Sequence, residues 1–144
     1  MPNFKIFLIT ANETLAANAS KAFASAGFNF VLQCSCADFF AQGWRDAGIV
    51  FLDLACVGQD KPAELKKFLG KMREVSVIAM CETPKTSNRE MIEILASGVD
   101  DAISTSIEMS LLMAKTRAYI RRVEVRRMIK TEQAAKKWCQ DGGN

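Results

Sequence analysis

The sequence predicts a single α/β domain built on a parallel sheet. Short apolar runs alternate with amphipathic stretches along most of the 144 residues. One run, residues 48–52, is apolar throughout and leads into Asp53, a pattern typical of a strand covered on both faces. Nearly half of the residues, 49%, are hydrophobic, which suffices for one buried core at this length. Strands alternating with helices form βαβ units, so we expect helices on both faces of the sheet.

The expected elements follow this alternation in order. Strands are predicted at residues 4–10, 28–32, 48–53, 75–80 and 99–103. Helices are predicted from Asn12 to Gly27 and at residues 36–43, 62–72, 87–98 and from 107 onward. Asn12 has the chemistry of an N-cap and Gly27 that of a helix terminator. Residues 87–90 and 105–108 both match a capping box, which predicts a helix start at each place.

The composition excludes several classes of function. Histidine is absent, which excludes Ser-His-Asp and Cys-His catalysis, histidine-rich zinc sites and a phosphohistidine carrier. The five cysteines are scattered, and Cys34 and Cys36 alone would make a poor zinc site. The N-terminus lacks a signal-peptide pattern and no apolar stretch approaches the roughly 20 residues of a membrane span. We therefore expect a cytoplasmic protein with reduced thiols and no membrane span.

Four segments resemble the response-regulator receiver domain of two-component signalling. They are Lys5–Ile9, Ile49–Leu54, Val77–Met80 and the stretch Ala-Ser-Gly-Val-Asp-Asp at 96–101. The resemblance covers roughly residues 4–122 and implies a flavodoxin-like sheet of strand order 2-1-3-4-5. It leaves residues 123–144 as a basic helical extension. It also implies that Asp53 is the phosphoacceptor position, and that the protein is a signalling module, not an enzyme, accepting at most a phosphoryl group from a kinase phosphohistidine.

The sequence departs from the family at the positions that support phosphorylation. Family members have an acid pair, a Ser or Thr, an aromatic residue and a Lys around the aspartate. The corresponding positions here hold Thr10 and Ala11, Cys81, Ala102 and Thr105. With Asp53 as the single candidate ligand, Mg²⁺ binding is expected to be weak, and we predict no cofactor.

These departures favour an atypical receiver, or pseudo-receiver, that acts by protein–protein contact with a histidine kinase or an output module. The alternative is a phosphorylatable regulator with weak Mg²⁺-dependent acceptance at Asp53.

Two further features have ordinary explanations. Asp100 and Asp101 are a carboxylate pair at the start of the fifth strand, which we interpret as a solvated turn away from Asp53. Cys56 and Cys81 follow the third and fourth strands, so both are expected near Asp53. Thiols in such places are more often inert than reactive.

The C-terminal segment is basic and helical. Residues 115–137 carry nine cations against two acids, a net charge of +7, which leaves −4 for the rest of the chain. The helical pattern runs from Ile107 to Cys139, about 50 Å, before Gly142 and Gly143 end it. Its apolar residues need a partner, but the heptad spacing is too short to assert a coiled coil.

Three interpretations of this segment remain open. It is a solvated stub leading to an output module, a homodimerisation helix, or a nucleic-acid contact. The absence of an aromatic or base-reading motif beside the arginines argues against the last.

Overall fold

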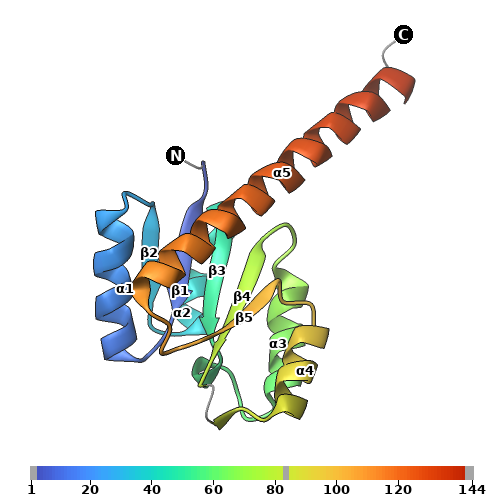
Figure 1. Cartoon of the computed structure of the whole chain (residues 1–144). Coiled ribbons are helices and arrows are strands. Elements are labelled where there is room, and N and C mark those ends of the chain that lie inside the picture. Colours follow the sequence, from blue (N-terminus) through green and yellow to red (C-terminus); the bar gives the residue numbers. More distant parts are fainter. Residues whose placement is uncertain (1–2, 83–84, 142–144) are drawn as a thin grey trace.

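The computed structural model describes residues 3–82 and 85–141 and consists of a five-stranded parallel sheet flanked by helices (Figure 1). The strands are β1 (Lys5–Ile9), β2 (Phe30–Gln33), β3 (Ala47–Asp53), β4 (Ser76–Cys81) and β5 (Asp101–Ser104). Their order in the sheet is β2-β1-β3-β4-β5, and every neighbouring pair is parallel. The predicted sheet and strand order are therefore confirmed.

Helices cover both faces of the sheet, as the alternating pattern predicts. They are α1 (Glu13–Ser25), α2 (Cys36–Ala41), α3 (Lys61–Lys71), α4 (Asn88–Ala96) and α5 (Met109–Asp141). Two short 3₁₀ segments, η1 (Trp44–Asp46) and η2 (Leu54–Cys56), flank β3. Because side chains alternate along a strand, the sheet has two cores. Phe51 of β3 packs on the side of α1 and α5, whereas Leu52 packs on the side of α2, α3 and α4.

The serine of one predicted capping box caps its helix, whereas the other predicted box does not form. The Ser87 side chain accepts a hydrogen bond from the Glu90 amide at 3.1 Å and caps α4. The Thr105 amide instead donates to the Cys81 carbonyl at 3.0 Å, which extends the contact between β4 and β5. The chain turns after this contact and α5 begins at Met109. The local pattern at residues 105–108 was overridden by pairing with a distant strand, so that prediction was wrong.

Asp100 lies in an exposed bend before β5, as predicted, but its carboxylate also makes contacts that the sequence did not indicate. One carboxylate oxygen of Asp100 accepts hydrogen bonds from the Ser76 hydroxyl at 3.0 Å and from the Val77 amide at 3.1 Å. The other oxygen lies 3.4 Å from the Arg126 guanidinium. Asp100 therefore joins the start of β5 to the start of β4 and to α5.

Asp101 makes a second set of contacts to α5. Its carboxylate accepts a hydrogen bond from the Tyr119 hydroxyl at 2.5 Å and lies 3.5 Å from the Lys115 ammonium group. Burial favours a higher pKa for Asp101, but the bonds from Tyr119 and the Ala102 amide and the charge of Lys115 hold its pKa below the ordinary value. The aspartate pair thus positions the last helix against the sheet.

Helix α5 is continuous and leaves the body at the amino end of the strands (Figure 1). The Arg127 guanidinium lies 4.9 Å from the centre of the Phe4 ring and donates a hydrogen bond of 3.4 Å to the Ala47 carbonyl. Lys130 forms an ion pair with Glu74. Arg126, Arg127 and Lys130, three of the cations of this segment, are therefore used in contacts with the body.

Beyond these contacts the helix projects, and its side chains at residues 124–140 are exposed. The predicted end at Gly142 and Gly143 lies outside the described residues. Within the described parts of the chain, none of the helices combines the length and hydrophobicity needed to cross a membrane.

Candidate functional site

Asp53 lies at the carboxyl end of β3, the strand at the centre of the sheet. All seven residues of β3 are buried, and the Asp53 side chain is itself 4% exposed. The chain turns directly into η2, where Asp53 acts as the cap: its Oδ1 accepts a hydrogen bond from the Ala55 amide at 3.0 Å. The carboxyl end of a parallel sheet is where ligands gather in this class of fold, so the structure places Asp53 where chemistry is expected.

Thr10 occupies the space next to this carboxylate. It follows β1, is 2% exposed, and donates a hydrogen bond from its hydroxyl to Asp53 Oδ2 at 2.7 Å. The same hydroxyl oxygen accepts a hydrogen bond from the Asn12 amide at 3.0 Å, which fixes its orientation. Both oxygens of Asp53 therefore have protein donors.

The positions beside Asp53 that hold an acid pair in the family supply no carboxylate for Mg²⁺ here, although Glu82 and Glu90 line the same cavity as Asp53. Octahedral Mg²⁺ is usually bound by one or two carboxylates together with water and phosphate oxygens. Thr10 and Ala11 supply no carboxylate, and Glu13 is an exposed residue at the first position of α1. Among residues 3–82 and 85–141, no three His, Cys, Asp or Glu side chains are grouped to hold a metal ion.

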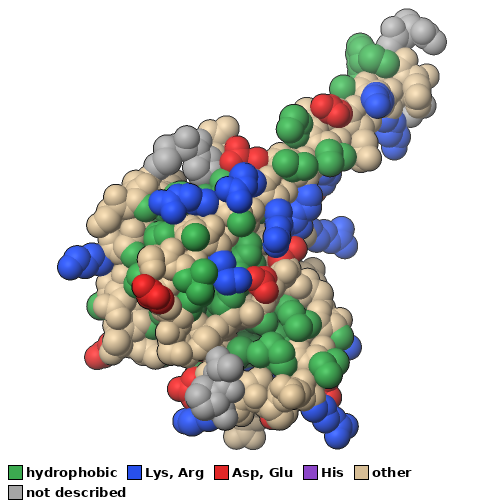
Figure 2. Space-filling model, viewed as in Figure 1, with side chains coloured by type: hydrophobic (Ala, Val, Ile, Leu, Met, Phe, Trp, Pro, Cys, Tyr) green, Lys and Arg blue, Asp and Glu red, His purple; other side chains and the backbone are tan. Residues whose placement is uncertain are grey.

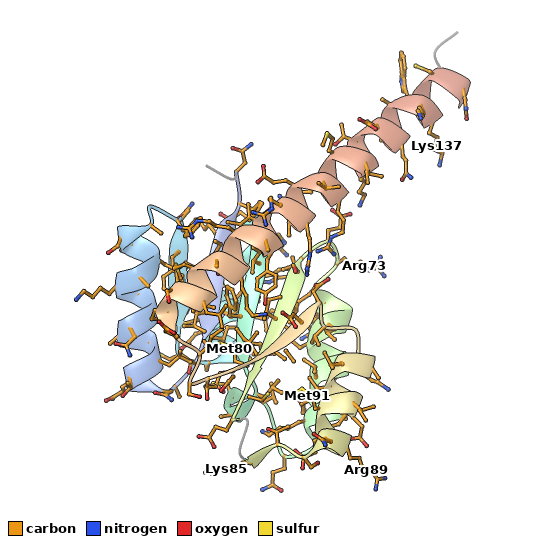
Figure 3. All side chains as sticks on the ribbon, in the orientation of Figure 1. Arg73, Met80, Lys85, Arg89, Met91 and Lys137 are labelled. Atoms are coloured by element: carbon orange, nitrogen blue, oxygen red, sulfur yellow. The ribbon has the colours of Figure 1, made fainter. Side chains whose placement is uncertain are left out.

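A cavity of about 200 Å³ opens beside Asp53. Lys61 and Lys85 line it, and the sequence pattern had not indicated either of them as a site residue. The Lys61 ammonium group, at the first position of α3, donates a hydrogen bond of 2.6 Å to the Leu54 carbonyl. Lys85 lies in the connection after β4, on the side of the body opposite the end of α5 (Figure 3), and pairs with Glu82 at 3.2 Å. Each lysine follows a strand whose carboxyl end faces the cavity. This position in the sequence could have indicated that the lysines lie near Asp53.

The counterparts of the family's switch residues are only partly brought together. Cys81 ends β4 and lines the cavity with Asp53, and its thiol lies 3.7 Å from the Ile103 carbonyl. Ala102 lies within β5 and Thr105 just beyond it, and neither is among the residues that line the cavity. Thr10 contacts Asp53 directly, whereas the neighbouring Ala11 is exposed.

The two thiols near Asp53, Cys56 and Cys81, both have a raised pKa. Burial raises the pKa of Cys81, and the charge of Asp53 adds to this effect against an opposing hydrogen bond with Thr86. The pKa of Cys56 is raised by burial first and by Asp53 second. All five cysteines are free. A thiol is nucleophilic as the thiolate, so a raised pKa argues against reactivity here.

No protein-family model and no curated protein sequence matches the chain. Solved structures do match. A CheY-like receiver domain protein from Methanospirillum hungatei aligns with a TM-score of 0.73 at 12% identity, over 87% of this chain and 99% of that one. The receiver domain of a putative LuxO repressor protein from Vibrio parahaemolyticus aligns with a TM-score of 0.74 at 14% identity, over 89% of this chain and 98% of that one.

A third match is a protein fused to a trimeric coiled-coil segment of yeast Spc42. It aligns with a TM-score of 0.71 at 12% identity and covers 97% of this chain and 94% of that one. At these identities the likeness establishes the fold. The chain has the fold of response-regulator receiver domains.

Proposed function

We propose that this protein is a receiver-type signalling module of two-component systems that works through protein–protein contact and is not switched by Mg²⁺-dependent phosphorylation. The observation that carries the proposal is the hydrogen bond of 2.7 Å from the Thr10 hydroxyl to Asp53 Oδ2. It places a neutral donor beside the phosphoacceptor position, where the family has a metal-binding acid.

The physical argument concerns charge. A carboxylate that attacks a phosphoryl group brings two negative groups together, and catalysis depends on a metal ion and cationic donors to offset the repulsion. Asp53 has a hydroxyl and an amide as its direct donors. Both satisfy the resting carboxylate, and neither adds positive charge.

A histidine kinase or an output module is the class of partner that the receiver fold supports. The body offers the ordinary surface of that fold, and α5 adds 17 exposed residues at positions 124–140. A signal carried by contact alone needs such a surface and does not need a phosphorylated state.

The test is the response to beryllofluoride with Mg²⁺, followed by the fluorescence of Trp44 and Trp138 and by amide chemical shifts. The native chain is expected to show no saturable change. The matched control is the triple variant Thr10→Asp, Ala11→Asp, Thr105→Lys, which restores the family residues and is expected to respond. A saturable response of the native chain that disappears in Asp53→Ala would contradict the proposal.

A second candidate is weak phosphoryl acceptance at Asp53, and the two lysines on its cavity favour it. Lys61 and Lys85 could offset part of the charge of a phosphoryl group there. Intact mass after incubation with acetyl phosphate, with and without Mg²⁺, separates the candidates. A gain of one phosphoryl group that is lost in both Asp53→Asn and Lys61→Met supports this second function and counts against the first.

A further inference from the structure

The outward face of α5 carries a regular seam along nearly its whole length. Its positions alternate in steps of three and four residues, the spacing of the a and d positions of a heptad. The seam consists of Leu111, Ala114, Ala118, Arg121, Val125, Met128, Glu132, Ala135 and Cys139. Seven of these nine positions are apolar. The seam begins on the part of α5 that packs on the body, so it is longer than the projecting end alone.

The body leaves most of this seam exposed, although Ala118 is half-buried. Leu111 is 50% exposed, Val125 48% and Met128 56%. The contacts that hold α5 to the body, such as Tyr119 with Asp101 and Lys130 with Glu74, come from the other side of the helix. Figure 2 shows hydrophobic side chains on the projecting part of α5 and cations gathered where it leaves the body. An apolar stripe of this kind on a helix indicates packing against another helix.

The two charged members of the seam, Arg121 and Glu132, indicate how a partner helix would be oriented. Within the described residues, neither Arg121 nor Glu132 takes part in a salt bridge. In a parallel, in-register pair each would meet its own copy, so that arginine faces arginine and glutamate faces glutamate. In an antiparallel pair, a positions face d positions, and one register places Arg121 against Glu132 of the second copy twice. We propose that α5 pairs with α5 of a second copy in this antiparallel register.

The same register matches the rest of the seam. Val125 faces Met128 of the second copy across the two-fold axis, Ala118 faces Ala135, and Ala114 faces Cys139. A two-fold interface is self-complementary, so each contact occurs twice. The small residues at the outer positions let the helices approach where one of them also lies on a body. The paired length from residue 114 to residue 139 is about 38 Å.

The flanks of the seam add one favourable contact and one neutral one. Trp138, 67% exposed, would lie beside Arg117 of the second copy, where a guanidinium can stack on the indole. On the other flank Lys115 would approach Lys136 of the second copy, but the charge of Lys115 is already paired with Asp101 at 3.5 Å. A hollow of about 610 Å³ beside Ala118 and Val125 leaves room for the second helix.

Charge reversal tests the register directly. Arg121→Glu places two glutamates together in each pair and Glu132→Arg places two arginines together, so each is expected to raise the dissociation constant of the dimer at least tenfold, or about 1.4 kcal/mol. The double variant Arg121→Glu, Glu132→Arg restores opposite charges and is expected to return to within about threefold of the native value. The measurement is sedimentation equilibrium of the full chain, with the exposed cation Lys137→Glu as the control.

Cross-linking gives an independent answer. Under mild oxidation, Ala114→Cys is expected to form an intermolecular disulfide with Cys139, identified by peptide mass spectrometry. A parallel pair would instead join Cys139 to Cys139 in the native chain. The proposal is overturned by a chain that stays monomeric up to 100 µM, roughly a hundredfold above the micromolar affinity that about −8 kcal/mol provides. It is equally overturned by a dimer in which the double reversal fails to restore affinity. Neither result bears on phosphorylation of Asp53.

Discussion

The hydroxyl of Thr10 donates a hydrogen bond of 2.7 Å to the carboxylate of Asp53, and both side chains are buried. This contact joins the ends of β1 and β3, two neighbouring strands of the sheet. The hydroxyl satisfies one oxygen of the buried carboxylate without adding a charge beside it.

Thr10→Val tests this contact because valine keeps the shape of threonine and removes the donor. Asp53 Oδ2 would lose a partner inside the protein, and the free energy of unfolding is expected to fall by about 1–3 kcal/mol. Urea denaturation followed by circular dichroism measures the change. Thr14→Val, at an exposed position of α1, is the matched control and should change stability by less than about 0.5 kcal/mol. Equal effects of the two substitutions would contradict a special role for Thr10.

Asp53→Asn is expected to make Cys56 more reactive. The charge of Asp53 contributes to the raised pKa of this half-buried thiol, after burial itself. Removing that charge lowers the pKa and increases the thiolate fraction, so alkylation by iodoacetamide at pH 8 should become faster. Rates for each cysteine are read by mass spectrometry in the same sample. Cys139, at the far end of α5, should react at an unchanged rate, and a uniform acceleration would indicate loosening of the whole protein instead.

Tyr119→Phe should destabilise the protein in a pH-dependent way. A carboxyl group whose pKa is lowered by folding stabilises the protein above its unfolded pKa of about 3.9, and this stability is lost as the pH falls through the folded pKa. Asp101 is such a group, and Tyr119 is one cause. The variant should lose about 1.5–3 kcal/mol at pH 7 and less at pH 3.

Urea unfolding at pH 7, 5 and 3 measures the effect of Tyr119→Phe. In the background of Asp101→Asn the same substitution should cost less, since the charge that strengthens the bond is gone. A loss that is the same at all three pH values would rule out a hydrogen bond to an ionised Asp101.

Gly48→Ala should loosen the anchor of α5. A Cβ at residue 48 would lie 2.1 Å from a ring atom of Phe4, and the same ring lies under the Arg127 guanidinium. Phe4 must move, and the free energy of unfolding is expected to fall by about 1–3 kcal/mol. Gly70→Ala is the matched control: a Cβ there meets nothing within 4 Å, and alanine in α3 should raise stability by about 0.5–1 kcal/mol. A neutral Gly48→Ala would show that Phe4 packs loosely.

Much of the fold could be predicted from the sequence because its signals are local. The fully buried β3 follows from an uninterrupted apolar run, and the start of α1 follows from Asn12, whose side chain caps the helix as expected. The strand order came from the family resemblance and from no local pattern. Where local and distant interactions compete, as at Thr105, the pattern alone favoured the wrong outcome.

The site could be predicted in position but not in interactions. The sequence places Asp53 at a strand end and shows that Thr10 is not an acid, but it does not show that the Thr10 hydroxyl bonds to Asp53. The sequence likewise does not show that Lys61 reaches the site from the start of α3. Asp101 and Tyr119 lie 18 residues apart on different elements, and nothing in the spacing of two polar residues signals such a contact.

The attachment of α5 at the amino end of the sheet has a mechanical consequence. Eighteen residues of continuous helix follow Val123, up to Asp141, an arm of about 27 Å. From Arg127, where the arm is fastened to Phe4, about 21 Å of helix remain, so a tilt of about 10° there would carry the tip about 4 Å sideways. A small movement of Phe4 against Gly48 would thus become a several-fold larger movement of Trp138. The arm acts as a lever on any partner that it touches.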